Sequence, residues 1–447
     1  MIKVITYGTF DIIHEGHIRL LKRAKALGDH LIVGITSDSY DKYRGKLNIV
    51  DPLPSRIDNI KATGLADEII VEEYEGQKID DIVDKEIDIF AIGSDWAGQF
   101  DYLNDYCKVV YLERTRGVSS TELRNDAHGL VHFGIVGAGR QAGLFFPESK
   151  FVSGITAECI FDYNIDTAKE YAAKHELSYC TNNYGELLSQ VSAVYIATPP
   201  ITRYNYAKQA ILAGKHVLCE PPMTLFSAQT EELFDLAQEK NLVLMEGLIT
   251  LHCPGFQRLV SLAKSGRIGD IKSLSVSHTR PAHPGSREMK GNTGGGSMSE
   301  LSPYPLLALH KLLGGNPESI CFTSQESPDG TDMMTTIALR YQSTVANVLL
   351  GLGVHSENQL IISGTRGYIH VASPWWKTEY FEIRHTDSGE TRKFFYEFIG
   401  EGIRYELVAF LKEIASGGGG LGFRQISSAQ AAIIEEYRKK GNVEIIV

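Results

Sequence analysis

Short hydrophobic runs alternate with amphipathic stretches along the first part of the chain. The run Val4-Ile5-Thr6-Tyr7 precedes a stretch over 18–27 whose apolar residues recur at helical spacing. Further apolar runs of strand length lie at 31–35, 67–71, 87–93 and 108–112, and 79–86 is a short amphipathic segment. Alternating strands and helices predict an α/β fold with a doubly wound parallel sheet. Ligands of such sheets bind beyond the carboxyl ends of the strands, so the residues after each run are the candidates for chemistry.

A second series of hydrophobic runs starts after a short junction at 125–130. Strands are expected at 131–136, 157–161, 193–197 and within 214–222, and then at 271–279, 335–341, 344–352 and 359–363. We therefore predict three domains, over residues 1–129, 130–252 and 253–447.

Composition limits the class of protein. The 447 residues are 43% hydrophobic and 22% charged, with a formal net charge of −11, which argues against nonspecific nucleic-acid binding. The six cysteines include no CxxC pair, so we expect neither a zinc site nor a disulfide framework. Met1 leads directly into a strand, and no apolar run has the length of a membrane span. We expect a cytoplasmic protein that does not bind a membrane.

A motif with two histidines follows the first strand and precedes the first helix. Backbone N–H groups at a helix N-terminus attract anions, and two imidazoles there can donate hydrogen bonds to a triphosphate. Glycine lets the backbone approach a ligand, and the second glycine leaves space beside the histidines. The alternative is a pair of surface histidines at a helix start. The motif residues are Gly8, Thr9, Phe10, Asp11, His14, Gly16 and His17.

Further polar residues follow the other strands of this series. The segment 40–54 contains Arg44 and Lys46 and is predicted to be a loop that carries cations, with Ser55 capping the next helix. Asp38 follows the second strand, and Asp95 and Trp96 follow the fourth.

The fifth strand is followed by a stretch that combines arginine, glycine and hydroxyl groups before a predicted helix. Such a stretch forms an anion cradle, although Ser119 and Glu122 also fit a capping box. The candidate residues are Arg114, Thr115, Gly117, Ser119 and Thr121.

Together these motifs resemble the glycerol-3-phosphate cytidylyltransferases of the HxGH nucleotidyltransferase superfamily. The resemblance implies a Rossmann-like domain in which the phosphate of a polyol phosphate attacks the α-phosphorus of CTP, with Mg²⁺ held through the CTP phosphates. The implied catalytic residues are His14, His17, Lys46 and Arg114, and the implied acceptor-binding residues are Arg44 and Lys78. The implied nucleotide-binding residues are Gly8, Thr9, Phe10, Asp11, Gly16, Asp95, Trp96, Thr115, Gly117, Ser119 and Thr121. For Lys46 and Lys78 the alternative is an ordinary solvated lysine.

A dinucleotide-binding fingerprint opens the second series. Gly137, Gly139 and Arg140 follow a strand in a GxGxxA pattern, and Asp162 ends the next strand where an acid would bind ribose hydroxyls, which favours NAD over NADP. Thr198 and Pro199 follow the third strand of the series, and Glu220 follows the fourth.

These stretches resemble the glucose–fructose oxidoreductase/inositol dehydrogenase family. The resemblance implies that a C-terminal α/β domain follows with an open, mostly antiparallel sheet. The implied NAD(H)-binding residues are Gly137, Gly139, Arg140, Asp162, Thr198, Pro199 and Glu220. The resemblance also implies an oxidoreductase site at Glu300 and Tyr304. Tyr304 between prolines is equally compatible with a core aromatic. The chain has Pro221 where the family has a lysine, and Arg203 where a histidine is common.

Three functions remain open from the sequence. The first is a bifunctional enzyme that reduces a sugar phosphate with NADH and activates the resulting alditol phosphate with CTP, for a teichoic acid or capsule polymer. The second is a cytidylyltransferase with a non-catalytic NAD-binding scaffold or sensor. The third is an adenylyltransferase, against which the sequence from Arg114 to Thr121 argues. Both families imply a homo-oligomer, with a dimer expected.

Overall fold

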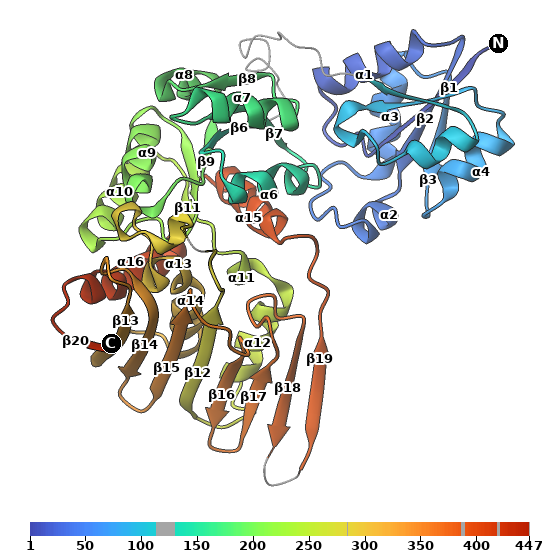
Figure 1. The fold of residues 1–447 in the computed structure, drawn as a ribbon. Coiled ribbons are helices and arrows are strands. Elements are labelled where there is room, and N and C mark those ends of the chain that lie inside the picture. The colour runs from blue at the N-terminus through green and yellow to red at the C-terminus, as the bar shows by residue number, and fades with distance from the viewer. Residues whose placement is uncertain (113–129, 284, 386–388, 418–420, 447) are drawn as a thin grey trace. The chain divides into compact units, whose positions relative to one another are not determined.

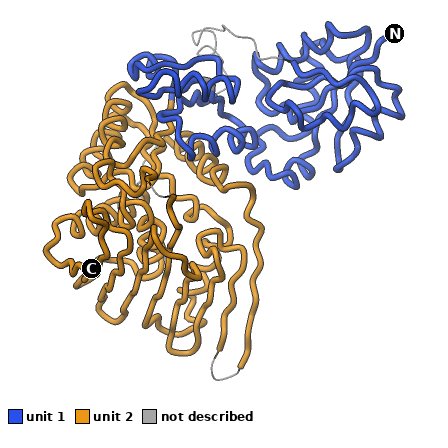
Figure 2. Tube along the Cα trace, viewed as in Figure 1, with its two compact units in different colours: residues 1–192 blue, residues 193–447 orange. Residues whose placement is uncertain are grey.

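The structure is a computed structural model that describes residues 1–112, 130–283, 285–385, 389–417 and 421–446 (Figure 1). Two compact units, Met1–Ser192 and Ala193–Val447, are distinguished in Figure 2 and are described separately.

The first sheet has five parallel strands in the order β3-β2-β1-β4-β5. The strands are β1 (Lys3–Gly8), β2 (His30–Thr36), β3 (Glu68–Glu72), β4 (Ile89–Gly93) and β5 (Lys108–Leu112). The helices are α1 (Glu15–Lys25), α2 (Asp38–Tyr43), α3 (Leu53–Thr63) and α4 (Gln77–Asp84), with the 3₁₀ turns η1 (Ser94–Trp96) and η2 (Asp101–Asp105). The prediction of a doubly wound parallel sheet is confirmed.

Both faces of this sheet are buried, which explains its continuous apolar runs. On one face, Val4 and Val33 pack with Leu21 of α1 and Ile60 of α3. On the other face, Ile5 and Phe90 pack among further apolar side chains, including Ile82 of α4 and Leu103 of η2. Adjacent residues of β1 therefore face opposite layers.

Two local predictions are wrong. Residues 40–43 belong to α2 rather than to a loop, because the Ser37 hydroxyl accepts the Tyr40 N–H at 3.2 Å and caps that helix. The next helix, α3, begins at Leu53 before Ser55, and Pro52 occupies its N-cap. Pro54 suits the first turn of α3 because it has no N–H to satisfy there.

A second parallel sheet follows in the order β11-β10-β9-β6-β7-β8. Unit 1 contains β6 (Val131–Val136), β7 (Ile155–Phe161), β8 (Tyr179–Thr181), α6 (Arg140–Ser149), α7 (Ile165–Lys174) and α8 (Tyr184–Gln190). Unit 2 begins with β9 (Ala193–Ile196), β10 (His216–Cys219), β11 (Leu244–Glu246), α9 (Pro200–Leu212), α10 (Ser227–Glu239) and α11 (Ile249–His252). The boundary after Ser192 thus falls between strands of this sheet, and the sequence-based boundaries stay predictions.

The rest of unit 2 contains a nine-stranded open sheet in the order β19-β18-β17-β16-β12-β15-β14-β13-β20 (Figure 1). The strands are β12 (Ile271–Thr279), β13 (Ser319–Glu326), β14 (Asp332–Arg340), β15 (Val345–Gly351), β16 (Leu360–Gly364), β17 (Gly367–Val371), β18 (Tyr380–His385), β19 (Thr391–Phe395) and β20 (Val443–Ile446). The helices are α12 (Pro254–Lys264), α13 (Ser297–Leu301), α14 (Pro303–Leu313), α15 (Ile403–Ala415) and α16 (Leu421–Arg438), with η3 (Arg287–Met289) and η4 (Gly291–Thr293). The β12–β15 and β13–β20 pairs are parallel and the other described pairs are antiparallel, so the predicted mostly antiparallel sheet is confirmed.

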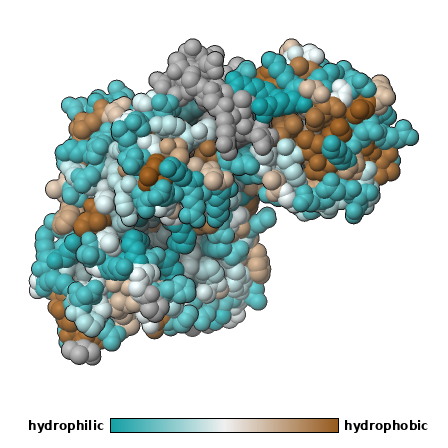
Figure 3. Space-filling model, turned by 45° about the horizontal axis from the view of Figure 1, so that its top comes forward, coloured by the Kyte–Doolittle hydropathy of each residue, from teal (hydrophilic) through white to brown (hydrophobic). Residues whose placement is uncertain are grey.

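The surface in Figure 3 is largely hydrophilic, with hydrophobic residues gathered on part of the visible face of the N-terminal domain. Among the described residues, no helix combines the length and the apolar character that crossing a membrane requires.

Candidate active site

The two motif histidines lie side by side where β1 gives way to α1. His14 is the N-cap of α1, with extended backbone, and its Nδ1 accepts the Gly16 N–H at 3.1 Å. The centroids of the His14 and His17 rings are 3.9 Å apart. A Cβ on Gly16 would lie 2.8 Å from the His14 Cε1 atom, so the glycine leaves room for the ring, as the sequence predicts.

His17 presents a polar atom that a ligand can satisfy. Its Nδ1 is buried and has no hydrogen-bond partner among the described residues. Burial lowers the pKa of His17 well below its ordinary value, and the neighbouring His14 and Lys46 lower it further. The ring is therefore neutral at neutral pH. An anion beside it would favour the protonated form and supply the missing partner.

The backbone between the strand and the histidines is strained. Phe10 and Ile12 adopt φ angles of 51° and 46°, in the left-handed region that residues with a Cβ rarely occupy. Such strain concentrates at functional sites. The Asp11 carboxylate lies between these two residues and accepts the N–H groups of Val50 and Asp51 at 3.0 and 2.8 Å. Asp11 therefore holds the loop after α2 against the motif.

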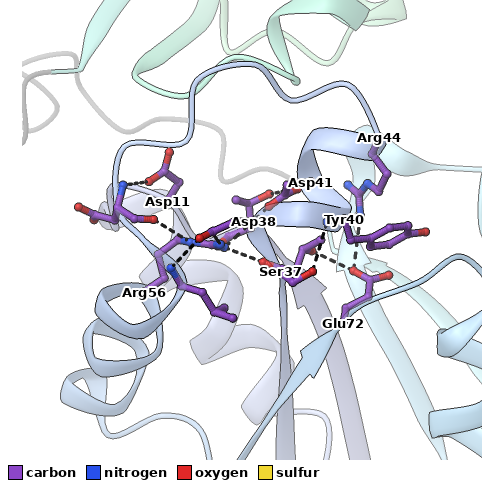
Figure 4. Close-up of polar contacts among 12 residues, drawn as sticks. Asp11, Ser37, Asp38, Tyr40, Asp41, Arg44, Arg56 and Glu72 are labelled. Carbon is purple, nitrogen blue, oxygen red and sulfur yellow. Dashed lines mark hydrogen bonds and ion pairs between the residues drawn. The ribbon is translucent and has the colours of Figure 1, made fainter.

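Arg56 is a site-organising residue that is not among the sequence-based candidates. It is fully buried and donates to the carbonyls of Thr9 and Thr36 at 2.5 and 2.9 Å. It also bonds the Asp51 carbonyl at 3.0 Å and the Asp38 carboxylate (Figure 4). The signal that could have found it is its place on the apolar stripe of α3, three residues after Leu53 and four before Ile60.

The predicted cations lie at the same edge of the sheet. Burial lowers the pKa of Lys46, while the Asp41 and Asp11 carboxylates oppose this effect. Lys78 is 8% exposed, so it is not an ordinary solvated lysine. It bonds to Glu72, and Arg44 lies 3.5 Å from the same carboxylate. Glu72 has no place among the sequence-based candidates.

The two histidines and the cations Arg44, Lys46 and Lys78 border a cavity of about 420 Å³ in unit 1. The predicted residues that line it are Gly8, Thr9, Phe10, Asp11, His14, Gly16, His17, Arg44, Lys46, Lys78, Asp95 and Trp96. Residues 149–157 also line it. Lys150 donates to the Asp95 carbonyl, and its Nζ lies 5.4 Å from the centre of the Trp96 ring, contacts that the sequence did not predict. The predicted residues Arg114, Thr115, Gly117, Ser119 and Thr121 lie outside the described residues.

The glycine-rich turn after β6 has the features that a dinucleotide needs. Gly137 has a φ of 95°, and Gly139 is the N-cap of α6, with no side chain capping that helix. The first N–H groups of α6, which starts at Arg140, therefore lack a side-chain cap and suit a pyrophosphate. Asp162 accepts the Ala138 N–H at 3.0 Å, which ties the end of β7 to this turn.

In unit 2, the residues after β9 and β10 are joined by Arg203. Its buried guanidinium donates to the carbonyls of Thr198, Glu220 and Pro222 at 2.7, 3.2 and 3.0 Å. Pro199 is the N-cap of α9, and the Glu220 carboxylate accepts the Tyr195 hydroxyl. Arg203 therefore links the backbone that follows β9 to the backbone that follows β10.

The predicted oxidoreductase residues have partners of their own. Both oxygens of Glu300 accept hydrogen bonds from Arg287, at 2.7 and 3.0 Å. The Tyr304 ring centre lies 5.9 Å from that of His278, and burial raises the pKa of Tyr304 well above its ordinary value. Arg287 was not among the sequence-based candidates. Pro221, where the related family has lysine, supplies neither a cation nor an N–H donor.

Comparison with known proteins connects the N-terminal geometry to a family. Residues 5–155 match the family described as cytidylyltransferase-like. Glycerol-3-phosphate cytidylyltransferase from Bacillus subtilis is 46% identical over 130 residues, which cover 29% of this chain and 100% of that protein. The Staphylococcus aureus enzyme of the same name is 41% identical, covering 29% of this chain and 97% of that protein. The chain belongs to the cytidylyltransferase-like family.

The rest of this cytidylyltransferase-like protein matches oxidoreductases. Residues 131–248 match the NAD-binding Rossmann fold of the GFO/IDH/MocA oxidoreductase family, and residues 256–370 match its C-terminal domain. A dTDP-3,4-didehydro-2,6-dideoxy-alpha-D-glucose 3-reductase from Actinomadura kijaniata is 27% identical, over 56% of this chain and 76% of that protein. The solved structure of KijD10, a 3-ketoreductase from the same organism in complex with NADP and TDP-benzene, has a TM-score of 0.65 at 24% identity and covers 71% of this chain and 99% of that one. This structural likeness shows the fold.

Substitution of Gly16 tests whether the position of the His14 ring matters for nucleotidyl transfer. We expect Gly16→Ala to lower kcat on the order of 100-fold, because its Cβ would displace the His14 ring, and small displacements of catalytic groups have effects of this size. Gly143→Ala is the matched control, since it is also a helical glycine and its Cβ would meet nothing within 4 Å. Steady-state kinetics measure both, and an unchanged kcat in Gly16→Ala would contradict this role.

A second prediction concerns pH. The pKa of folded His17 lies below its ordinary value of 6.5, so the unfolded chain binds the proton first as pH falls. The free energy of unfolding of this domain should therefore decrease below pH 6.5, by up to about 1.4 kcal/mol per pH unit from this group. Hydrogen exchange of the β1 and β2 amides in the full chain measures how the free energy of unfolding changes with pH. We expect the His17→Asn variant to take up one proton fewer on unfolding, so its free energy of unfolding should depend less on pH. The same pH dependence in the variant and the original protein would contradict the lowered pKa of His17.

Proposed function

We propose that the protein transfers CMP from CTP to glycerol 3-phosphate or a related polyol phosphate, giving a CDP-alditol and pyrophosphate. The observation that carries this proposal is the pair His14 and His17, whose ring centres lie 3.9 Å apart, with an unpartnered Nδ1 on His17. Both histidines line a cavity that Lys46 also lines. The identity of 46% to a glycerol-3-phosphate cytidylyltransferase over its whole length supports the choice of acceptor. The product would serve a teichoic acid or capsule polymer.

The proposed chemistry needs positioning and charge stabilisation rather than a covalent nucleophile. A phosphate oxygen of the acceptor attacks the α-phosphorus of CTP, and the bond to pyrophosphate breaks. His14 and His17 hold the α- and β-phosphates, Lys46 and Arg114 stabilise the developing charge, and Arg44 and Lys78 bind the acceptor phosphate.

The remaining proposed contacts complete the nucleotide site. The proposed nucleotide-binding residues are Gly8, Thr9, Phe10, Asp11, Gly16, Asp95, Trp96, Thr115, Gly117, Ser119 and Thr121. Among the described residues no group of three or more histidine, cysteine, aspartate or glutamate side chains is arranged to hold a metal. Mg²⁺ is therefore proposed to enter with the CTP phosphates.

Pyrophosphate release tests this function. With CTP and glycerol 3-phosphate we expect turnover, with ATP none, and with His14→Ala a loss of at least ~100-fold, because hydrogen-bond donors to developing charge contribute that much. Circular dichroism verifies that the variant is folded. Turnover with ATP in place of CTP would favour adenylyl transfer, and full activity in His14→Ala would overturn the site.

The C-terminal parts support a second proposal, a domain that binds NAD(H). The uncapped N-terminus of α6 and the positive φ of Gly137 suit the pyrophosphate of the cofactor, which would supply hydride chemistry in an active oxidoreductase. Asp162 is the proposed ribose ligand, with Thr198, Pro199 and Glu220 as further cofactor contacts. Reduction of a sugar phosphate would use Glu300 and Tyr304, and a homodimer is proposed for the assembly.

One substitution and two sets of contacts favour a non-catalytic scaffold or sensor over that reduction. Position 221 has no amine, Arg203 is committed to backbone carbonyls, and Glu300 is paired with Arg287. An acid–base relay at Tyr304 would need a group that these residues do not supply.

An assay with sugar phosphates distinguishes the two. We expect NADH to bind, as measured by its fluorescence, and not to be consumed when a panel of sugar phosphates and CTP is added. If a sugar phosphate gives CDP-alditol only in the presence of NADH, both parts are enzymes and the scaffold proposal is wrong.

A further inference from the structure

A buried carboxylate stands behind the two cations assigned to the acceptor. Glu72 is the last residue of β3 and is 1% exposed. One of its oxygens, Oε1, accepts from the Lys78 Nζ atom. The other, Oε2, accepts the Thr36 hydroxyl at 2.9 Å and lies 3.5 Å from the Arg44 Nη1 atom (Figure 4). One side chain thus joins β2, β3, α4 and the residue that follows α2.

Glu72 itself does not line the cavity, whereas Arg44 and Lys78 do. The carboxylate can therefore affect a bound anion only through its two partners. Glu72 is therefore not placed to act as a general base, because a general base must reach the proton that it removes.

Lys78 is held on several sides. Its Nζ lies 4.8 Å from the centre of the Tyr7 ring and 5.6 Å from that of Phe100, within range of cation–π attraction. The Tyr7 hydroxyl donates to Asp81 at 2.7 Å, which fixes that ring. Burial and the Arg44 charge lower the pKa of Lys78, and the Glu72 carboxylate raises it. A buried ammonium without this carboxylate would lose either its proton or its position.

We propose that Glu72 is a positioning residue for the acceptor, one that holds Lys78 and Arg44 against the cavity so that they bind the phosphate of the incoming polyol. This inference rests on the proposed cytidylyl transfer to a phosphate acceptor. It adds a residue that touches neither substrate and that acts on only one of the two.

Steady-state kinetics of the full chain test this role. We expect Glu72→Gln to raise KM for glycerol 3-phosphate about tenfold or more, a loss of about 1.4 kcal/mol of binding, and to leave KM for CTP within about threefold. A general loss of structure would affect both substrates. Equal increases in both KM values, or a lower KM for the acceptor, would overturn the proposal.

Glu68→Gln is the matched control. Glu68 lies on the same strand and pairs with Lys85, just beyond the end of α4, at 2.7 Å, but it belongs to the opposite end of β3. We expect both of its KM values to stay within about twofold of the original protein, because exposed ion pairs contribute little. A change equal to that of Glu72→Gln would show that any lost ion pair on β3 has this effect, and the proposal would be wrong.

A double-mutant cycle shows whether Glu72 acts through Lys78. We expect Lys78→Met alone to raise KM for the acceptor, and Glu72→Gln to add less than about twofold in the Lys78→Met background. If the effects of the two substitutions on KM for the acceptor are fully additive, Glu72 does not act through Lys78 and the proposal is wrong. If Glu72→Gln does not fold, Glu72→Asp replaces it in the same cycle and must give an intermediate KM for the acceptor. No turnover by the original protein with any polyol phosphate would instead refute the proposed function.

Discussion

The buried guanidinium of Arg56 is the interaction on which the N-terminal site depends. Its donors satisfy the carbonyls at Thr9 and Thr36, just past β1 and at the end of β2, and they also reach Asp51 and Asp38. These groups belong to three separate segments of the chain, at 9, 36–38 and 51, and the carbonyls of Thr9 and Thr36 need a donor because they are buried. Because arginine presents its donors in a rigid planar fork, one side chain fixes all of these segments at once. The strained backbone at Phe10 and Ile12 is stable only in such an overdetermined setting.

At the same edge of the sheet, carboxylates accompany the buried cations that border the cavity. An acidic chain that binds polyanions must concentrate cations locally, yet a buried cation needs a counter-charge. Glu72 supplies it for Lys78 and Arg44, and Asp41 and Asp11 oppose the effect of burial on the pKa of Lys46. Each carboxylate reduces the net positive charge at the cavity, but it keeps a cation charged and oriented before a ligand arrives. Such preorganisation lowers the cost of binding.

Residues 131–248 and 256–370 match the two domains of an oxidoreductase family, and several of their polar groups are bonded within the protein. Proline replaces lysine at 221, Arg203 bonds backbone carbonyls, and Arg287 occupies both oxygens of Glu300. A fold depends on its apolar pattern, which the chain retains, whereas a reaction depends on a few groups with available protons. Similarity of fold therefore does not by itself establish that a reaction is catalysed.

The sequence by itself determined what is local. Apolar runs predicted the strands, and the HxGH motif placed two histidines at a helix start, because a helix N-cap and the spacing within one turn need no distant residue. The GxGxxA turn, and the proline at 221 where the related family has a lysine, were likewise recognisable from neighbouring residues alone. Local reading failed at α2, where the Ser37 cap outweighed a polar composition typical of loops.

Only the tertiary structure decided which charged residues are buried and what they contact. Arg56 reaches the Thr9 carbonyl 47 positions away, and Glu72 receives the Thr36 hydroxyl from 36 positions away. Nothing near Glu72 in the sequence distinguishes it from the partly buried Glu68 four residues earlier on the same strand. Their difference arises because Glu72 contacts Thr36 of β2, Lys78 of α4 and Arg44, whereas the Glu68 side chain stays 40% exposed. Burial is a property of the assembled layers rather than of the residue.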